Sequence, residues 1–569
     1  MLRLAVALLA IPAAFLPLSA AAEPTRSDAH FDTLITNAHV VDGTGSPWYA
    51  ADVGIRGGRI AAIGKLARAR ATRRINANGK TLAPGFIDML GQSELTILVD
   101  PRLPSKIYQG ITTEITGEGT SVAPLSGHAL VEMTPQLEHY GLTADWKTFA
   151  EYFVRLERQQ IGINIASYVG ATQVREIVIG GADRAATPAE LNAMRTLVRE
   201  AMLQGAVGLS TSLEYTPAPY ASTEELIALA SEAAKYGGIY ATHMRSEGDG
   251  IGAALDEAFR IGREAHIPVE IWHLKVAGKA NWGRMGEIVK RIDAARAAGI
   301  DVAADTYAYP AWFNEMSAFV PPWAHDGGNA KLLQRLRDPA ARARIRRDME
   351  TASSDWDNEW SEIATPDAVL IGVVKNPALH ALQGQTLAAI AAARGKDPLD
   401  TLLDILVEDD GFTSCAVFGM NEDDIRLAFA QPWTSADNDS SGAAPDGLLG
   451  AEHPHPRAYG TFPRMLRKYV REEHVLSLEE AIRKFTSLPA GRLRLNDRGV
   501  VKVGMAADLV VFDPDTVTDR STFEAPNQLA SGMQWVLVNG VAVIDNGKMT
   551  GARPGRVLRG PGYTAAATH

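Results

Sequence analysis

Short runs in which apolar and polar residues alternate occupy both ends of the chain. Residues 33–84 alternate in this way between Gly-rich turns, and the same pattern returns in "GMAADLVVFDP" (504–514) and "MQWVLVNGVAVIDNGKMTG" (533–551). Alternation over four to eight residues between turn signals predicts short strands. Because the two β-rich ends flank a different middle, we expect one small β-domain assembled from residues 23–84 and 491–569, the latter including a C-terminal tail.

The middle of the chain, residues 85–490, alternates strand-like apolar runs with amphipathic helical patterns. Helical spacing is clear in "STEELIALASEAAKYGG" (222–238) and "DGIGAALDEAFRIGREAH" (249–266). Eight strand–helix units predict an α/β protein with a (β/α)8 TIM-like barrel. The eight apolar runs are "TLAPGFIDM", "GITTEIT", "INIASYVG", "AVGLSTS", "GIYATHM", "PVEIWHL", "IDVAADTYAY" and "PWTSADN".

One connection is far longer than the others. More than a hundred residues separate Tyr309 from Pro432, and they include the charged stretch "AKLLQRLRDPAARARIRRDMETASSDWDNEW" (330–360). We interpret residues 312–430, approximately, as a helical insertion between strands seven and eight. Active sites of such barrels lie at the mouth formed by these connections, so the insertion is expected to cover the site.

The N-terminus, "MLRLAVALLAIPAAFLPLSAAAEP", has the features of a secretory signal peptide. Arg3 precedes an apolar run, and "SAAAE" offers a small-residue cleavage site after Ala22. A membrane anchor is the alternative, but Pro12 and Pro17 break the short apolar run. We therefore expect residues 1–22 to be removed and the protein to be exported, to the periplasm or outside the cell. No later segment is long and apolar enough to predict a membrane span.

Composition narrows the possible partners. The 569 residues are 46% hydrophobic, which allows a large core, and the formal net charge is −11 with charges of both signs interspersed. No basic patch of the kind that binds nucleic acid is present in the sequence. The single cysteine, Cys415, cannot form an internal disulfide. Its context, "GFTSCAVFGM", predicts a buried strand, so we interpret Cys415 as a packing residue and not as a nucleophile.

Polar residues follow the predicted strands of the middle region. Strand five ends in "ATHMRSEGD" with His243, strand six in "IWHLKVAG" with His273, and strand eight in "SADN" with Asp437. Two imidazoles at the ends of successive barrel strands can bind one metal ion, commonly zinc. An Asp opposite them can take a proton from water and return it to a leaving amine. Each residue alone has a structural explanation, but the three together predict a metal-dependent hydrolase.

Several motifs together resemble the amidohydrolase superfamily, in its D-aminoacylase or N-acyl-D-amino-acid deacylase branch. The resemblance runs from about residue 33 to about residue 557, and its specificity lies in the combination. The motifs are "APGFID", "THMRSEGD", "HLK", "HPRAYGTFPR", "LSLEEAIRKFTSLPAGRLRLNDRG" and "VGMAADLVVFDP". It implies a metal-bearing barrel, a β-sandwich built from both ends, and hydrolysis of the acyl amide of a D-amino acid.

The resemblance also implies roles for individual residues. His243 and His273 match zinc ligands, and Asp437 matches the general base and acid. Lys275, two residues after the second His, and Tyr307 or Tyr309 match residues that contact substrate. From chemistry alone, Arg457 in "HPRAYG" is a further candidate for binding a substrate carboxylate. Tyr215, in "STSLEYTPAP", is a candidate wall of the pocket, and His453 and His455 are interpreted as loop residues.

Two departures from the family pattern alter the expected metal site. The family's His-x-His pair falls on Leu90 and Gln92, and its zinc-binding Cys falls on Gly119 of "TGEGTS". Glu118 directly precedes Gly119, and a carboxylate is an ordinary zinc ligand. We therefore predict one zinc ion per chain, bound by Glu118, His243 and His273 with water in the fourth position. Leu90 is expected to pack, and Gln92 to hydrogen-bond substrate or water.

Two other functional hypotheses remain open at this stage. The same barrel and metal are compatible with a dipeptide, a cyclic amide, a lactone or another ester as substrate, because the altered residues line the place where the scissile group binds. A non-catalytic ligand-binding relative is the third hypothesis, although retention of two His and an Asp argues against it. The sequence does not indicate the acyl group, the amino acid or the oligomeric state.

Overall fold

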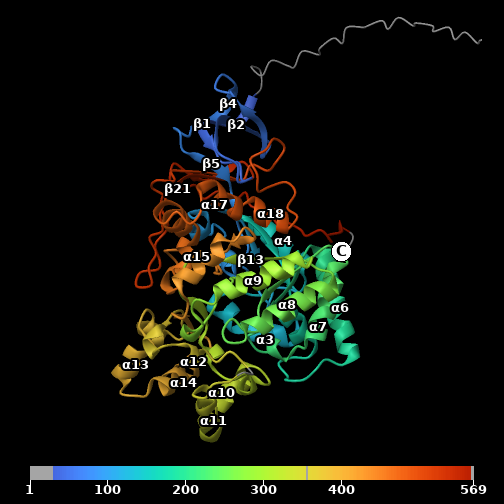
Figure 1. Cartoon of the computed structure of the whole chain (residues 1–569), viewed down its shortest axis with the longest axis vertical. Coiled ribbons are helices and arrows are strands. Elements are labelled where there is room, and N and C mark those ends of the chain that lie inside the picture. Colours follow the sequence, from blue (N-terminus) through green and yellow to red (C-terminus); the bar gives the residue numbers. More distant parts are fainter. Residues whose placement is uncertain (1–29, 354–355, 566–569) are drawn as a thin grey trace, which may run out of the picture.

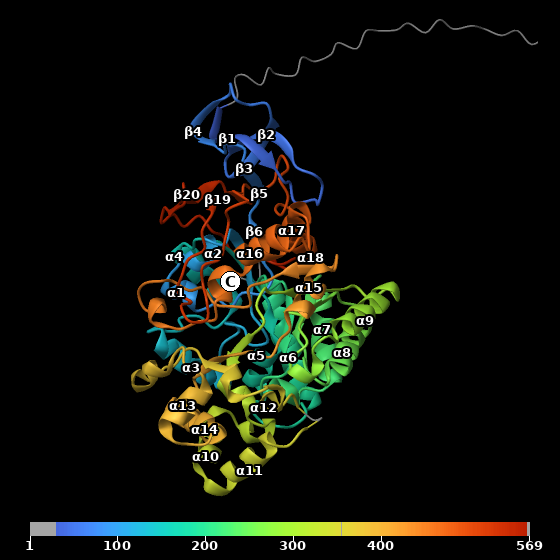
Figure 2. The same ribbon diagram turned by 60° about the vertical axis from the view of Figure 1, so that its left-hand side comes forward.

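The computed structural model describes residues 30–353 and 356–565 (Figure 1). The predicted signal peptide, residues 1–22, lies outside the described residues. Within them, no helix combines the length and the apolar character needed to cross a bilayer. The terminal β-domain lies at one end of the molecule, and the insertion, with α10 to α14, lies at the opposite end (Figures 1 and 2).

Strands from both ends of the chain form one nine-stranded sheet, in the order β21-β20-β19-β18-β5-β1-β2-β3, with β4 paired to β1. The two halves meet where β5 and β18 pair antiparallel, Leu82 opposite Val511. The predicted β-domain from both termini is thus confirmed. Its strands are β1 (His30–Val40), β2 (Tyr49–Arg56), β3 (Arg59–Gly64), β4 (Arg70–Asn76), β5 (Thr81–Pro84), β18 (Leu509–Phe512), β19 (Met533–Val538), β20 (Val541–Asp545) and β21 (Lys548–Met549).

Each of the eight predicted apolar runs contains a parallel strand. These strands form a three-stranded sheet, β6-β7-β8, and a six-stranded sheet, β17-β13-β12-β11-β10-β9. Backbone hydrogen bonds from Met89 N to Ala436 O (3.5 Å) and from Asp439 N to Leu90 O (2.9 Å) link the two sheets. The strands are β6 (Phe86–Asp88), β7 (Ile111–Thr116), β8 (Asn164–Ser167), β9 (Val169–Gly170), β10 (Gly208–Ser212), β11 (Ile239–His243), β12 (Val269–Ile271), β13 (Val302–Thr306) and β17 (Thr434–Ala436).

The first apolar run, residues 81–89, is not one strand as the pattern predicted. It is divided at Gly85 into β5, which belongs to the terminal sheet, and β6, which begins the parallel set. A Cβ atom at Gly85 would lie only 2.2 Å from Thr112 Oγ1, so a side chain has no room at this junction. The chain therefore passes between the two domains at a position that only glycine fits.

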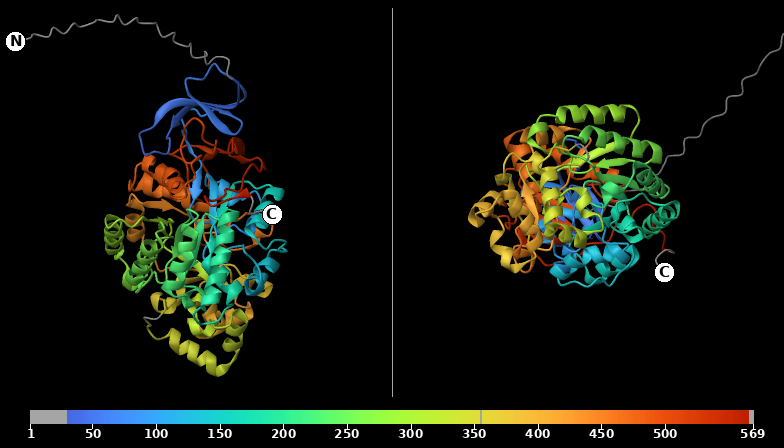
Figure 3. Two further views of the ribbon diagram at one scale, coloured as in Figure 1. Left: turned by 90° about the vertical axis from the view of Figure 1, so that its right-hand side faces the viewer. Right: turned by 90° about the horizontal axis from the view of Figure 1, so that it is seen from below.

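Helices cover the outside of the parallel strands (Figure 3). The helices predicted in residues 222–238 and 249–266 are confirmed as α7 and α8. Ser222 caps α7 by accepting a hydrogen bond from Glu225 N at 3.2 Å. These helices are α3 (Gly127–His139), α4 (Phe149–Gln159), α5 (Ala171–Val178), α6 (Pro188–Gln204), α7 (Thr223–Ala234), α8 (Ile251–Ala265), α9 (Met285–Ala297), α15 (Glu422–Ala430), α16 (Arg457–Arg464), α17 (Leu478–Phe485) and α18 (Ser487–Arg492).

The insertion between β13 and β17 contains more than helices. Three antiparallel strands, in the order β14-β16-β15, form a small sheet within it, so the prediction of a helical insertion was incomplete. Cys415 is buried in β16, as the sequence predicted. The elements are β14 (Trp312–Glu315), β15 (Val369–Ile371), β16 (Ser414–Val417), α10 (Asn329–Arg337), α11 (Pro339–Met349), α12 (Glu359–Glu362), α13 (Leu387–Arg394) and α14 (Pro398–Glu408).

Candidate metal centre

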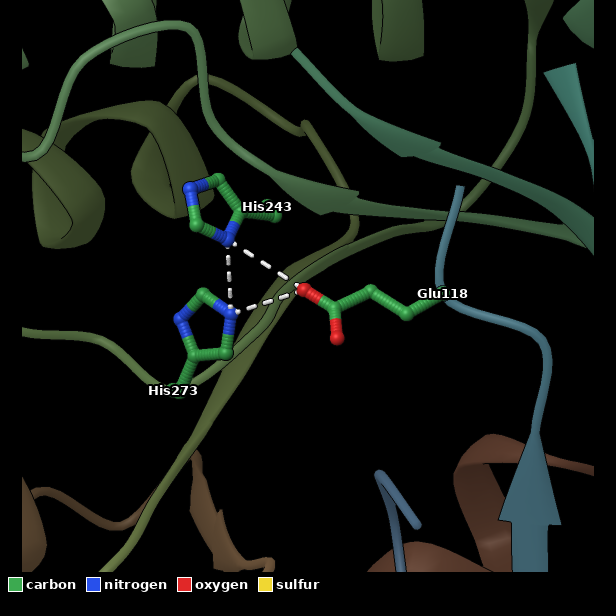
Figure 4. Close-up of side chains that lie close together, drawn as sticks. All are labelled: Glu118, His243 and His273. Atoms are coloured by element: carbon green, nitrogen blue, oxygen red, sulfur yellow. Dashed lines mark hydrogen bonds and ion pairs between the residues drawn. The ribbon is translucent and has the colours of Figure 1, made fainter. Parts of the chain in front are cut away.

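Glu118, His243 and His273 converge at the carboxyl ends of three parallel strands, the paired β11 and β12 and, in the other sheet, β7 (Figure 4). His243 Nδ1 lies 3.1 Å from His273 Nε2 and 3.2 Å from Glu118 Oε1, and His273 Nε2 lies 3.3 Å from the same oxygen. Tetrahedral zinc with bonds of about 2.0–2.1 Å separates its ligand atoms by roughly 3.3 Å. The three donor atoms therefore have the spacing that one zinc ion requires.

The local backbone explains why these side chains face one point. His243 is the last residue of β11, and Glu118 follows β7 by two residues. His273 follows β12 by two residues and has a φ of +35°, an unusual conformation for a residue with a side chain. Its backbone N–H donates to Asp305 Oδ1, on β13, at 2.5 Å. A carboxylate on the next strand thus stabilises the conformation that turns the imidazole inward.

The charge balance of the cluster suits a cation. Burial alone would raise the pKa of Glu118, but hydrogen bonds from His243 and His273, with their charges, outweigh it and hold that pKa well below its usual range. The carboxylate therefore stays ionised and faces two ring nitrogens in a buried site. Positive charge beside Glu118, from a metal ion or from protonated imidazoles, keeps its carboxylate ionised.

Each imidazole has a second carboxylate on its opposite nitrogen. His243 Nε2 lies 2.8 Å from Glu214 Oε2, and His273 Nδ1 lies 3.0 Å from Glu247 Oε1. Such partners fix the ring orientation of metal-binding histidines and raise their basicity. Neither residue was predicted from the sequence, although Glu214 follows β10 by two residues and Glu247 lies in the "THMRSEGD" motif.

Glu214, His243 and Glu247 form a second group with metal-ligating atoms close together. It uses the opposite nitrogen of the same His243 ring, and His243 Nε2 lies 3.9 Å from Glu247 Oε2. The first group offers two imidazoles and one carboxylate, a common zinc ligand set. Glu214 contacts His243 within hydrogen-bond distance, and Glu247 forms an ion-pair contact with His273.

The residues at the family's missing ligand positions have clear local roles. Gln92 Nε2 donates to Glu118 Oε2 at 2.7 Å and to Asp439 Oδ1 at 3.1 Å, so it orients the carboxylate of the predicted ligand. Leu90 is buried and packs, as predicted. Gly119 has a φ of +63°, and a Cβ there would lie 2.5 Å from Ser212 Cβ. A cysteine at position 119 does not fit this backbone.

Two predicted carboxylate-binding cations are already paired within the protein. Lys275 Nζ donates to Glu247 Oε2 at 2.6 Å and lies 2.7 Å from His273 Nδ1. Arg457 Nη1 lies 2.6 Å from Asp439 Oδ2. Lys275 lines the cavity in front of the metal centre, whereas Arg457 is not among the lining residues.

The predicted aromatic residues separate into two groups. Tyr215 lines the cavity, and the centre of its ring lies 4.8 Å from that of His243. Tyr307 and Tyr309 are buried and are not among the lining residues of the cavity. The Tyr307 hydroxyl contacts Met420 Sδ at 3.4 Å, and its ring packs 4.7 Å from the Arg457 guanidinium. The Tyr307 ring also lies 5.9 Å from Lys275 Nζ, whereas Tyr309 packs against Arg464 and His455.

Two aspartates follow β17, and they differ in position. Asp437 is fully buried, and neither of its carboxylate oxygens has a hydrogen-bond donor among the described residues. Burial raises the pKa of Asp437 to about 6. Asp439, two residues later, lines the same cavity as Glu118 and both histidines. The sequence analysis did not single out Asp439, which shares with Asp437 the position after an apolar strand.

The cavity in front of the metal centre has a volume of about 520 Å³, within the range of small-molecule sites. Its walls come from the strand ends and from the insertion, which contributes Trp312, Asn314 and Asp357. The predicted covering of the site by the insertion is therefore confirmed. His453, whose Nε2 contacts Phe523 O at 2.8 Å, and buried His455 lie outside the metal-ligating groups.

Comparison with known proteins shows which family this chain resembles. The model of the amidohydrolase family matches residues 73–544, and that of the urease alpha-subunit N-terminal domain matches residues 18–79. A D-aminoacylase from Alcaligenes xylosoxydans xylosoxydans is 38% identical over 538 residues, 94% of this chain and 99% of the relative.

Two solved structures are similar over 93% of this chain and all of theirs. An N-acyl-D-glutamate deacylase from Bordetella bronchiseptica, solved with zinc and a phosphonate mimic of the tetrahedral intermediate, has a TM-score of 0.78 and 34% identity. A D-aminoacylase, solved to define the role of its binuclear metal centre, has a TM-score of 0.77 and 37% identity. The chain belongs to the amidohydrolase family, in the group that contains the D-aminoacylases and N-acyl-D-amino-acid deacylases.

Proposed function

We propose that this protein hydrolyses the amide bond of N-acyl-D-amino acids at a single metal ion, most simply zinc, held by Glu118, His243 and His273. The observation that carries the proposal is the mutual spacing of 3.1–3.3 Å among the three donor atoms. The relatives named above support the reaction class, because they are a D-aminoacylase and an N-acyl-D-glutamate deacylase. Their similarity to this chain extends over nearly their full length.

The chain's own residues determine how such a reaction would be arranged. When bound, the metal supplies Lewis acidity that polarises the scissile carbonyl and acidifies a water molecule. Gln92 orients the Glu118 carboxylate, while Glu214 and Glu247 orient the imidazoles, so the ligand set is pre-organised. Tyr215 and residues of the insertion form part of the cavity wall beside these ligands.

The proton is proposed to move through one of the two aspartates after β17. The sequence prediction is Asp437, whose pKa of about 6 suits proton exchange near neutral pH. The cavity lining favours Asp439, because a general base must reach the reacting water. Asp439 accepts a hydrogen bond from Gln92 and pairs with Arg457, so its carboxylate is held facing the metal ligands.

One metal per chain is proposed, although a D-aminoacylase relative has a binuclear centre. The two positions that match the family's His-x-His pair carry Leu90 and Gln92. Leu90 has no ligand atom, and the amide of Gln92 is engaged with Glu118 and Asp439. Elemental analysis after dialysis tests this proposal, since two tightly bound equivalents would refute it.

We also propose that the parallel strands close into one (β/α)8 barrel and that the protein is exported after cleavage near Ala22. The hydrogen bonds between the segments after β6 and β17 support closure. The apolar N-terminal segment with its small-residue site supports export. N-terminal sequencing of the active protein would show a start near Glu23, and an intact Met1 would contradict the export proposal.

A panel of substrates tests the reaction itself. N-acyl-D-amino acids should be hydrolysed by the zinc-loaded protein, and N-acyl-L-amino acids, lactones and cyclic amides should react more slowly. Faster hydrolysis of a lactone or another ester would indicate that the protein is a lactone or ester hydrolase instead. Failure of every compound, with zinc bound and the fold intact, would favour the non-catalytic alternative.

A further inference from the structure

The cavity at the metal centre is lined by an excess of acidic side chains. Eleven Asp and Glu residues line it, against one lysine, Lys275. That lysine is already paired with Glu247 at 2.6 Å. The carboxylates are Glu94, Glu118, Glu132, Glu176, Glu214, Glu247, Glu315, Asp357, Glu362, Asp439 and Glu452.

This cavity continues into a second one, of about 330 Å³. Several residues line both, and they include Glu132, Glu176, Glu214 and Glu315. We call the passage lined by these shared residues the neck. Because Glu214 also contacts His243, the neck begins directly beside the candidate metal ligands. A substrate bound at the metal would extend through the neck into the second cavity.

Glu176 is the least compensated of these carboxylates. Its side chain, on α5, is only 7% exposed and faces both cavities. Within residues 30–353 and 356–565, no hydrogen bond or ion pair to its carboxylate is present. Its carboxylate neighbours Glu132 and Glu315 add negative charge, while Glu132 contacts His128 at 3.5 Å. Burial without a partner raises the pKa of Glu176 to about 8, so the group is mostly protonated at pH 7 in the free protein. A cationic group placed in the neck would supply the missing partner and favour the carboxylate.

The cationic side chains near the neck do not pair with the Glu176 carboxylate. Arg245 lines the second cavity, but it is bound to Glu257 at 2.9 Å and to the carbonyl oxygens of Pro219 and Ala221. Burial lowers the pKa of His325 to about 4, so this lining residue is neutral at pH 7. The described walls of the neck therefore keep a net negative charge.

We propose that Glu176, with Glu132 and Glu315, forms a subsite for a cationic group of the substrate, an ammonium or a guanidinium. The inference rests on the proposed function and narrows it to substrates that carry a positive charge in addition to the carboxylate. The charge can belong to the amino-acid side chain, as in an N-acyl-D-lysine or N-acyl-D-arginine. It can instead belong to the acyl part, as in a dipeptide with a free amino terminus.

The same electrostatics would discriminate against acidic substrates. A second carboxylate in the neck would lie near Glu132 and Glu315, with no free cation among the described lining residues. Like charges brought together in a poorly solvated site repel strongly. N-acyl-D-glutamate, the substrate class of the Bordetella relative, is therefore expected to be a poor substrate of this protein.

The test compares kcat/KM for four substrates with the zinc-loaded full-length protein. They are N-acetyl-D-arginine, glycyl-D-leucine, N-acetyl-D-leucine and N-acetyl-D-glutamate. One of the two cationic compounds should exceed N-acetyl-D-leucine by roughly 10- to 100-fold, the usual effect of a hydrogen bond to a charged group. Whichever compound leads identifies the part of the substrate that carries the charge.

Glu176→Gln should reduce the ratio of kcat/KM for the cationic substrate to that for N-acetyl-D-leucine by about tenfold or more. Glu315→Gln provides a second variant, and Glu200→Gln, an exposed glutamate on α6, is the matched control. If the wild type hydrolyses cationic and neutral substrates at equal rates, and Glu176→Gln does not alter this, the proposed subsite is wrong. The proposed function would still hold. If the protein hydrolyses none of the four compounds and none of a wider panel, the proposed function is wrong, and the subsite inference that rests on it fails with it.

Discussion

Glu214 Oε2 lies 2.8 Å from His243 Nε2, on the opposite edge of the imidazole from Glu118. The ring thus lies between two carboxylates, one directed at the metal position and one behind it. If Nδ1 binds the metal, Nε2 carries the proton and donates it to Glu214, which fixes the tautomer. Glu214 is therefore a positioning residue for the metal ligand.

Glu214→Gln is expected to weaken zinc affinity by roughly 10- to 100-fold, because partners behind metal-binding histidines typically contribute that much. Competition against a chromophoric chelator measures the affinity independently of activity. Glu200→Gln is the control and should behave like the wild type. Zinc affinity within twofold of the wild type in Glu214→Gln would show that the contact has no role in metal binding.

Glu118→Ala should release the metal and abolish activity together, because it removes the anionic ligand. Glu118→Gln retains the shape but not the charge, and should also weaken binding. Metal content after dialysis and turnover are the two measurements. A fully loaded and fully active Glu118→Ala protein would exclude Glu118 as a ligand.

Introduction of the family's cysteine should not rescue the Glu118 variant. Cβ at position 119 would collide with Ser212, and the φ of +63° disfavours a residue with a side chain. Glu118→Asn combined with Gly119→Cys is therefore expected to be unstable or metal-free. Recovery of stoichiometric zinc in this double variant would show that the loop adopts a different backbone.

Asp439→Asn should retain zinc and lose about 10²–10⁴-fold in kcat, the usual effect of removing a general base. Asp437→Asn, measured in parallel, tests the sequence-based assignment. Circular dichroism and metal content should show that both variants are folded and loaded. A large loss of kcat for Asp437→Asn together with near-normal turnover for Asp439→Asn would assign the proton transfer to Asp437.

Glu176→Gln should stabilise the protein in a pH-dependent way. Burial, with the charges of Glu132 and Glu315, raises the pKa of Glu176 from 4.5 to about 8. Between these values the folded state keeps a proton that the unfolded chain has lost, so this group's contribution to stability falls as pH rises from about 4.5 to 8. The gain in melting temperature of the variant should be near zero at pH 4.5, increase towards pH 8 and then level off. A pH-independent gain would contradict the raised pKa.

Some parts of the fold were predictable from local pattern. Alternation marked the strands of the terminal domain, and apolar runs with helical spacers marked the parallel strands. The division at Gly85 agrees with the predicted domain boundary between residues 84 and 85, but residues 81–84 were also counted in the first parallel strand, because β5 and β6 form one continuous apolar run. The small sheet of the insertion was also missed as a whole, although the strand around Cys415 was recognised.

The sequence by itself determined which residues form the candidate metal-ligating cluster. Parallel strands bring their carboxyl ends to one edge, so Glu118, His243 and His273 had to approach one another once those strands were recognised. The tertiary structure alone decided the partners of these residues: Glu214 behind His243, Glu247 between His273 and Lys275, and Asp439 facing the cavity. Those contacts depend on strand order, register and the path of a hundred-residue insertion. A hydrophobic pattern fixes which face of a strand is buried, but not which charged side chain meets another at the carboxyl ends of the strands.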